Sequence, residues 1–357
     1  MKKFLIGTTA LIGAAMIAGA AQAEDPKVMV GGVIDFQAGY ADQDGSANQS
    51  DFGFRNDTEV SFSVHGKADN GLGYGAVIDL EADVTGDANN EGLNASNTYV
   101  FMDGSFGRFE LGSTAGAAET LAVEADNIAR GTGGIDGDWV YFANPTGAGF
   151  ISTPGLGAEH GSVTAFGDES SFNANKINYY SPRFSGFQLG VSYTPDLENR
   201  GQLVDRLENG YGDVWEAGLN YEGDWDGLGF AAAATGIMGD AEFAGGNDLE
   251  GYNVGLATNL YGFNVAGSYG DWLDTLGVDA DYYTVGLGYD FGPFGASATW
   301  LDSSAGANDF ENLVIGADYS LAPGLTPYAE VSMFDADGGA GASNDGTVVI
   351  LGTELAF

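Results

Sequence analysis

The chain has 357 residues, of which 51 are acidic and only 11 are basic, so its formal net charge is −40. A charge this negative excludes partners that are bound through basic patches, such as nucleic acid or an anionic lipid surface. Cysteine is absent, so no disulfide framework supports the fold. Aromatic residues make up 12% of the chain, which is too many for a disordered acidic polypeptide.

The first 23 residues have the pattern of a secretory signal peptide. Two lysines precede an apolar stretch from Phe4 to about Gly19, and Ala21-Gln22-Ala23 supplies the small residues of a cleavage site. We therefore expect a mature chain that begins near Glu24 and forms one domain, residues 24–357. No later stretch has the roughly 20 consecutive apolar residues that a membrane helix needs.

Polar and apolar residues alternate along most of the remaining chain, which is the pattern of β-strands with one wet face. Between residues 57 and 68, Val60 and Phe62 fall on one side, and Asp57 and Glu59 fall on the other. Seven short turns, each with glycine, alternate with eight longer polar segments, which include Ala115–Ala174, Ser303–Phe310 and Asp335–Asp345. The sequence thus predicts sixteen strands, the first over Val28–Tyr40 and the last over Gly346–Phe357.

An even number of strands, with short turns at one end and long loops at the other, is typical of a transmembrane β-barrel. A soluble β-sandwich or solenoid has the same period, but its exposed edges would need lysine or proline, and both are scarce here. Aromatic residues gather at the predicted strand ends, as they do at membrane interfaces: Tyr40, Tyr193, Tyr221, Phe263, Tyr269, Phe291, Trp300 and Phe357. We predict an all-β fold, a sixteen-stranded antiparallel transmembrane β-barrel.

Four stretches resemble the general porins of alphaproteobacteria, the Rhodobacter-type group within the Gram-negative porin superfamily. They are Asn97–Gly112, Gly116–Leu121, Lys176–Tyr193 and the terminal Leu355-Ala356-Phe357. The resemblance implies an outer-membrane homotrimer among lipid and lipopolysaccharide, whose water-filled channels pass small hydrophilic solutes and ions. It also implies that the third loop, here 115–174, folds into the lumen, and that barrel-assembly machinery reads Phe357 as an insertion signal.

Parity along the strands predicts which charged side chains line the lumen. The inward acids are Asp57, Glu59, Asp79, Glu81, Asp83 and Glu110. For the constriction we expect five acids on the inward loop, Glu119, Glu124, Asp126, Asp136 and Asp138, facing four wall cations, Arg55, Lys67, Arg108 and Lys176. Such porins often carry a row of arginines on the wall, and this chain is poor in basic residues, so we expect a preference for cations.

Two other readings stay open. The first alternative to a general channel is a substrate-specific channel, in which Tyr180 and Tyr282 would supply aromatic contacts. The second is a barrel whose acidic loops serve adhesion or divalent-ion bridging. Calcium is conceivable at Asp42, Asp44, Asp335 and Asp337, because carboxylates two residues apart can share the ion. We expect no other cofactor and no enzyme activity, since His65 and His160 are the only histidines and neither belongs to a catalytic constellation.

Overall fold

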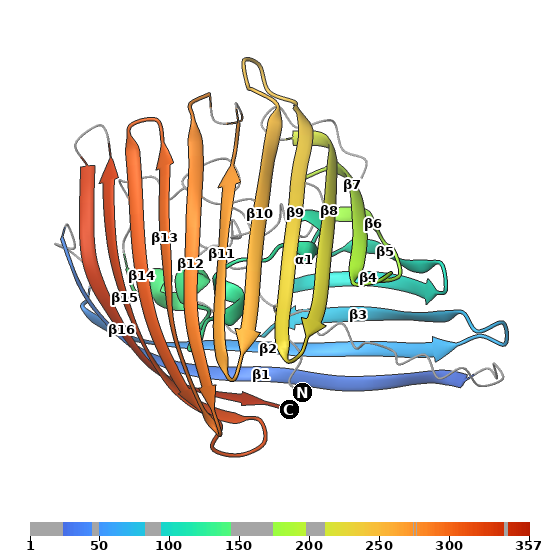
Figure 1. The fold of residues 1–357 in the computed structure, drawn as a ribbon, viewed down its shortest axis with the longest axis horizontal. Coiled ribbons are helices and arrows are strands. Elements are labelled where there is room, and N and C mark those ends of the chain that lie inside the picture. Colours follow the sequence, from blue (N-terminus) through green and yellow to red (C-terminus); the bar gives the residue numbers. More distant parts are fainter. Residues whose placement is uncertain are drawn as a thin grey trace.

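The computed structural model describes residues 24–44, 50–82, 94–143, 174–197, 211–273, 275, 277–338 and 342–357. Within these residues, sixteen antiparallel strands form one closed barrel, in which each strand pairs with its neighbours in the chain (Figure 1). β1 (Glu24–Gln43) closes the ring against β16 (Ala342–Ala356). The other strands are β2 (Phe52–Lys67), β3 (Gly73–Glu81), β4 (Asn94–Gly104), β5 (Gly107–Ser113), β6 (Asn175–Tyr180), β7 (Phe187–Asp196), β8 (Tyr211–Trp225), β9 (Leu228–Ala241), β10 (Leu249–Leu260), β11 (Phe263–Asp271), β12 (Ala280–Phe291), β13 (Phe294–Ala305), β14 (Asn308–Tyr319) and β15 (Leu325–Gly338).

Closure of the ring satisfies the backbone groups that lipid cannot hydrogen-bond. At the seam, Asp35 lies opposite Glu354 and Tyr40 lies opposite Val349. Gly32 and Phe357 exchange two main-chain hydrogen bonds, of 3.1 and 3.0 Å, at the end of the chain. The predicted fold class and the predicted pairing of the first and last strands are therefore confirmed.

The seven predicted short turns are all present, and those between β8 and β13 lie together at the lower end of the view in Figure 1. Asp226 and Gly227 both have positive φ, 54° and 87°, as do Tyr261 and Gly262, at 53° and 89°. Two successive residues with positive φ match the right-handed twist of the flanking strands, so these turns connect hairpins tightly.

Two segments predicted as long loops, 303–310 and 335–345, are strand over most of their described residues. β13 continues to Ala305 and β14 begins at Asn308, so Ser303 pairs with Phe310 across the ladder. In the same way Asp335 pairs with Asp345, and β15 runs on to Gly338. Beyond the hydrocarbon layer both faces of a strand meet water. A loss of apolar alternation there does not mean that strand pairing ends.

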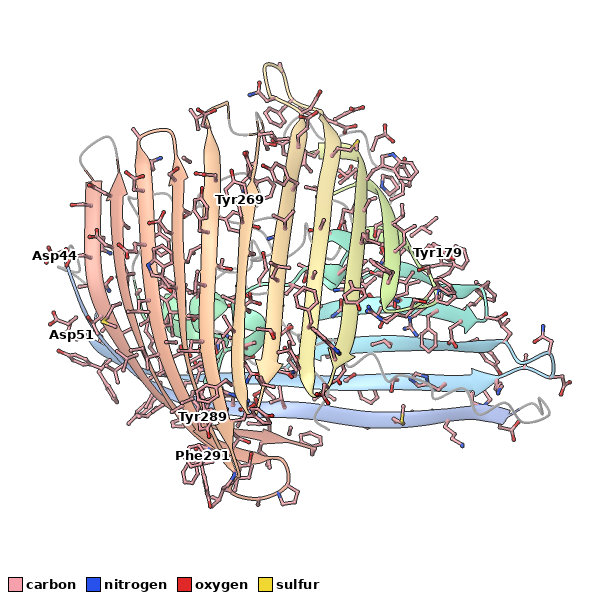
Figure 2. All side chains as sticks on the ribbon, in the orientation of Figure 1. Asp44, Asp51, Tyr179, Tyr269, Tyr289 and Phe291 are labelled. Carbon is pink, nitrogen blue, oxygen red and sulfur yellow. The ribbon has the colours of Figure 1, made fainter. Side chains whose placement is uncertain are left out.

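The outer face of the barrel is apolar in the middle and aromatic at both ends of the strands. On the long-loop side, the rings of Tyr269 and Tyr283 are in contact, with centroids 4.8 Å apart and planes tilted by 42°. On the short-turn side, Phe263 and Tyr289 lie 4.4 Å apart, and Phe291 extends this second belt (Figure 2). Two aromatic belts, one at each end of the strands, match the two interfaces of a membrane.

The inner face carries the polar residues, as in β8, where Glu216 and Asn220 are buried while Trp215 and Leu219 are exposed outward. Helical structure in the described chain is confined to the segment 115–143, as α1 (Ala117–Leu121), η1 (Asp126–Ile128), η2 (Gly134–Asp136) and η3 (Asp138–Tyr141). None of these turns is long and apolar enough to cross a membrane. Figure 1 shows them in green within the ring of strands.

Candidate pore constriction

The segment 115–143 begins on the inner wall at β7 and β8. The amide of Ala117 donates to Ser192 Oγ at 2.7 Å, and the amide of Ala118 donates to Glu216 Oε2 at 3.0 Å. These amides belong to the first turn of α1, where no intrahelical acceptor exists. Asn220 Nδ2 then donates to the carbonyl of Leu121 at 3.1 Å, so wall side chains hold both ends of α1.

The next contacts are made by Glu124, whose side chain points into the wall and is only 2% exposed. Its Oε1 accepts hydrogen bonds from the amide group of Asn253 on β10 and from the hydroxyl of Tyr282 on β12. Burial raises the pKa of Glu124 well above its ordinary value, and the nearby negative charge of Asp126 raises it further. Glu124 was predicted to line the constriction. It anchors the segment instead.

Arg130 attaches the next part of the segment to β12, β13 and β14. Its amide donates to Ser297 Oγ at 2.8 Å, and its guanidinium pairs with Asp290 and, at 3.4 Å, with Asp318. Arg130 was not among the residues predicted for the constriction. Its signal in the sequence is that it is the one basic residue of 115–143.

Farther along, the segment reaches β13 and β15. Thr132 donates to the Glu330 carboxylate from both its amide, at 2.9 Å, and its hydroxyl, at 2.8 Å. The amide of Ile135 donates to Thr299 Oγ1 at 3.1 Å. The segment thus follows the inner wall around the barrel, because inward hydroxyl, amide and carboxylate groups satisfy the main chain of these short turns.

The described segment ends against β1 and β2. Asp138 Oδ2 lies 2.9 Å from Nη1 of Arg55 on β2 and also accepts a hydrogen bond from Gln37 on β1. Burial raises the pKa of Asp138 to about 6, although Arg55 and Gln37 act to lower it. Arg55 and Asp138 were predicted to face each other across the lumen. They form an ion pair on the same side of it.

The remaining predicted acids of the segment are less buried than Glu124. Glu119, Asp126 and Asp136 are all half-buried. Burial raises the pKa of Asp126 to about 6. These three acids and Asp138 are the carboxyl groups of 115–143 that keep part of their surface exposed.

The wall of β2 to β5 carries the lumen acids that were predicted by parity. Asp57, Glu59 and Glu81 point inward with their nearest carboxylate oxygens within 4.8 Å of one another, and in the described residues they form the single such group of three or more possible metal ligands. Glu59 lies directly opposite Glu81 in the ladder. Asp83, predicted with them, and His160 lie outside the described residues.

The predicted wall cations do not form a row of free positive charges. Arg108 pairs with Glu110 at 2.6 Å and lies over the ring of Phe101, 4.0 Å from its centroid. Lys176 is buried and Lys67 is half-buried. Arg55 and Arg108 thus each sit beside a carboxylate, which cancels much of the field that they would exert on a passing ion.

The two tyrosines that favoured a substrate-specific channel are covered by the segment. Tyr282 is fully buried beneath Glu124, and Tyr180 is 5% exposed with its hydroxyl 3.0 Å from Thr120 Oγ1. Neither ring is open to a solute. The described residues therefore give no support to an aromatic path that includes these two tyrosines.

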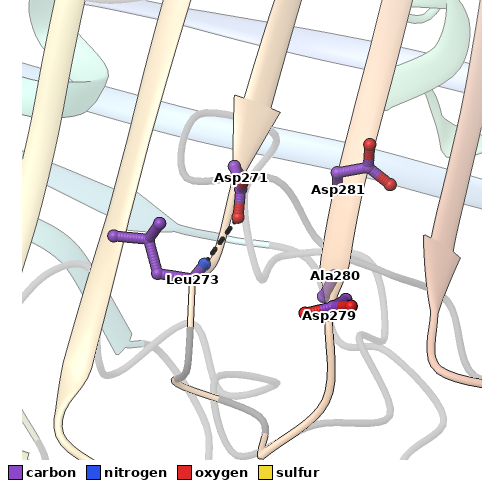
Figure 3. Close-up of a pocket in the computed structure, with 5 residues that line it drawn as sticks. All are labelled: Asp271, Leu273, Asp279, Ala280 and Asp281. Carbon is purple, nitrogen blue, oxygen red and sulfur yellow. Dashed lines mark hydrogen bonds between the residues drawn. The ribbon is translucent and has the colours of Figure 1, made fainter.

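The acids of the outer rim lie on another surface. A pocket at the ends of β11 and β12 is lined by Asp271, Leu273, Asp279, Ala280 and Asp281, and Asp271 Oδ1 accepts a 2.7 Å hydrogen bond from the amide of Leu273 (Figure 3). The four aspartates considered for calcium are also near this rim and are not part of the one carboxylate group described above: Asp42, Asp44, Asp335 and Asp337. Calcium binding at these four residues stays a prediction.

Comparison with known proteins decides the family, because the Gram-negative porin family matches residues 7–339. The chain belongs to the Gram-negative porins. An uncharacterized protein of Rickettsia conorii, RC0098, is 27% identical, with 93% of each chain covered. The porin of Rhodobacter capsulatus is 25% identical over 77% of this chain and 94% of its own. The solved structure of an anion-selective porin from Comamonas acidovorans has a TM-score of 0.65 at 17% identity, covering 93% of this chain and all of that one.

These matches confirm the resemblance to Rhodobacter-type porins and place this porin in the outer membrane as a multi-pass β-barrel. Members of the family are channels, not enzymes. A shared barrel does not fix the sign of the preferred ion, since the Comamonas acidovorans protein is named as anion-selective. The preferred ion therefore depends on the charges that each chain places along its own pore.

Proposed function

We propose that this porin is a passive, water-filled channel for small hydrophilic solutes and that it prefers cations. The observation that carries the proposal is the balance of charge on the inner surface. Carboxylates such as Asp57, Glu59 and Glu81 gather on the wall, while the arginines beside them are neutralised by acid partners. Fixed charge in a lumen with low-dielectric walls raises the local concentration of counter-ions.

The family suggests the rest of the arrangement. We infer that the mature protein is a homotrimer, that residues 1–23 are removed as a signal peptide, and that Phe357 serves as the insertion signal. The outward belts of aromatic side chains would contact lipid and lipopolysaccharide. The segment 115–143 would narrow each of the three pores from the inside.

Single-channel recording in planar bilayers tests this proposal. The purified protein should insert in steps of three and conduct steadily, and its current should rise with solute concentration without saturating. Saturation by one solute would replace the general channel with a substrate-specific one. A protein that inserts without conducting would favour the barrel whose acidic loops serve adhesion or ion bridging.

A further inference from the structure

Arg55 is a wall residue that contacts both the barrel and the end of the segment 115–143. Its Nη1 lies 2.9 Å from Asp138 Oδ2 and 3.2 Å from Asp57 Oδ2. Its guanidinium carbon also lies 3.9 Å above the ring of Tyr141. One planar cation therefore joins β2 to two residues of the segment, Asp138 and Tyr141, which are the first and last residues of η3.

The surroundings of η3 show that this contact completes a docked turn. Trp139 is 1% exposed, with its ring near Phe310 and Phe334 at centroid distances of 6.2 and 5.6 Å. The ring of Phe142 lies on the backbone of Gly39, where an added Cβ would come within 2.2 Å of it. Apolar packing thus holds the inner side of η3, and Arg55 holds its charged side.

We propose that Arg55 is a positioning residue: it fixes η3 of the segment 115–143 to the wall and so sets the width of the pore, and it contributes little to ion selectivity. The inference rests on the proposed channel function. Its physical basis is that the charge of Arg55 lies within 3.2 Å of two carboxylates, so its field at the pore axis is largely cancelled. The Arg55 and Asp138 side chains are each only 14% exposed. Loss of Arg55 therefore leaves the buried Asp138 without its cation, and loss of Asp138 releases η3 from Arg55, which then keeps only Asp57 as an acid partner.

This reasoning gives opposite expectations for a positioning role and for a field role. Arg55→Met removes a positive charge and Asp138→Leu removes a negative one. If Arg55 acts through its field, the two variants shift the zero-current potential in a KCl gradient in opposite directions. If Arg55 positions η3, both variants lose the steady open current in the same way. Their current is noisier, and larger neutral solutes pass through the pore.

The double variant Arg55→Met with Asp138→Leu sharpens the test. Apolar side chains of similar size can replace both partners of a buried ion pair at little cost, so we expect the double variant to recover steady current. If the current of the double variant is noisier than that of either single variant, the proposal is overturned. So would an Arg55→Met channel with normal noise and a stronger cation preference.

Arg108→Met is the matched control. Arg108 also faces the lumen and also pairs with an acid, but Glu110 and Phe101, which it contacts, are both on strands. This variant should keep the steady current of the wild type. Barrel formation in each variant is read from heat-modifiable migration on a gel, and Arg55→Lys, which keeps the charge but loses the planar contact with Tyr141, should be noisier than the wild type with unchanged selectivity. A silent wild type would refute the channel itself, whereas a steady Arg55→Met channel would refute only the role of Arg55.

Discussion

At the scale of single residues, Glu124 shows how burial favours the neutral form of a carboxyl group that anchors a segment. Burial raises its pKa well above the ordinary value, and its Oε1 accepts hydrogen bonds from Asn253 and Tyr282. Glutamine has nearly the same shape and keeps that acceptor. Glu124→Gln should therefore leave the conductance and the zero-current potential at pH 7 unchanged.

Glu124→Leu is the informative counterpart. It removes the acceptor and leaves the buried groups of Asn253 and Tyr282 without their partner, at a cost of about 1–3 kcal/mol. We expect noisier channels from this variant, recorded under the same conditions. A reduced cation preference in Glu124→Gln would show that Glu124 is charged and faces the pore.

Asp126 and Asp138 predict a pH dependence of selectivity. Burial raises the pKa of each to about 6, so both lose their negative charge as the pH falls from 7 to 5. Cation preference should decline around pH 6, above the pH near 4 at which exposed carboxylates titrate. A raised pKa also means that the docked segment binds protons more tightly than a released one. Proton binding therefore makes a favourable contribution to the free energy of docking at low pH, and this contribution is lost as the pH rises through 6.

Zero-current potentials recorded between pH 4 and 8 provide the measurement. The double variant Asp126→Asn with Asp138→Asn should lack the step near pH 6 and keep the one near pH 4. A wild type with a single step near pH 4 would contradict the raised pKa values.

Residue-scale prediction from the sequence succeeded on the strands and failed on the segment between them. The strand period of two assigns the inner face without any knowledge of neighbours, and on that basis Arg55, Asp57 and Glu110 were predicted to lie on the inner wall. The segment 115–143 has no such period. The direction of Glu124 depends on Asn253 and Tyr282, more than 120 residues away, and no local pattern encodes that contact.

At the scale of elements, the segment 115–143 is stabilised by its contacts with the wall and not by its own helical turns, which are three to five residues long. Trp139 is the largest apolar contact of its last turn. Trp139→Ala should cost about 3–5 kcal/mol of docking energy, typical for the loss of a buried aromatic side chain, while the barrel remains closed.

Trypsin can report the release of the segment, because Arg130 is the one basic residue between 115 and 143. Trp139→Ala should be cleaved there faster than the wild type, as measured by mass spectrometry on the folded protein. The matched control is Trp225→Ala, which removes the same side chain from an exposed position on β8. Equal cleavage of the two variants would mean that Trp139 does not hold the segment in place.

Strand order and turn positions were predictable because each hairpin is local in the sequence and glycine marks its turn. The lengths of the strands were not. The segments 303–310 and 335–345 were predicted as loops because their polar residues resemble those of a turn. In the structure Ser303 pairs with Phe310 and Asp335 pairs with Asp345. Backbone pairing above the membrane depends on the neighbouring strands, which a local pattern cannot represent.

At the scale of the whole molecule, the negative charge of the chain is distributed over two surfaces with different consequences. Acids such as Asp57, Glu59 and Glu81 face the lumen, while Asp335 and Asp337 are exposed on the outer face of β15. Fixed charge within about 8–10 Å of a permeating ion, one Debye length at physiological salt, is only partly screened. Only the lumen set should therefore influence selectivity.

The last prediction uses this difference. Permeability should favour K⁺ over Cl⁻, more strongly at low salt, because screening weakens as the Debye length grows. Removing three negative charges from the segment, by Glu119→Gln, Asp126→Asn and Asp136→Asn together, should reduce that preference in the zero-current potential across a KCl gradient. Removing charge from the outer face, by Asp335→Asn with Asp337→Asn, should leave it unchanged. An anion-selective wild type would contradict the proposed cation preference, and an equal effect of the two sets would mean that charge acts from the rim and not from the constriction.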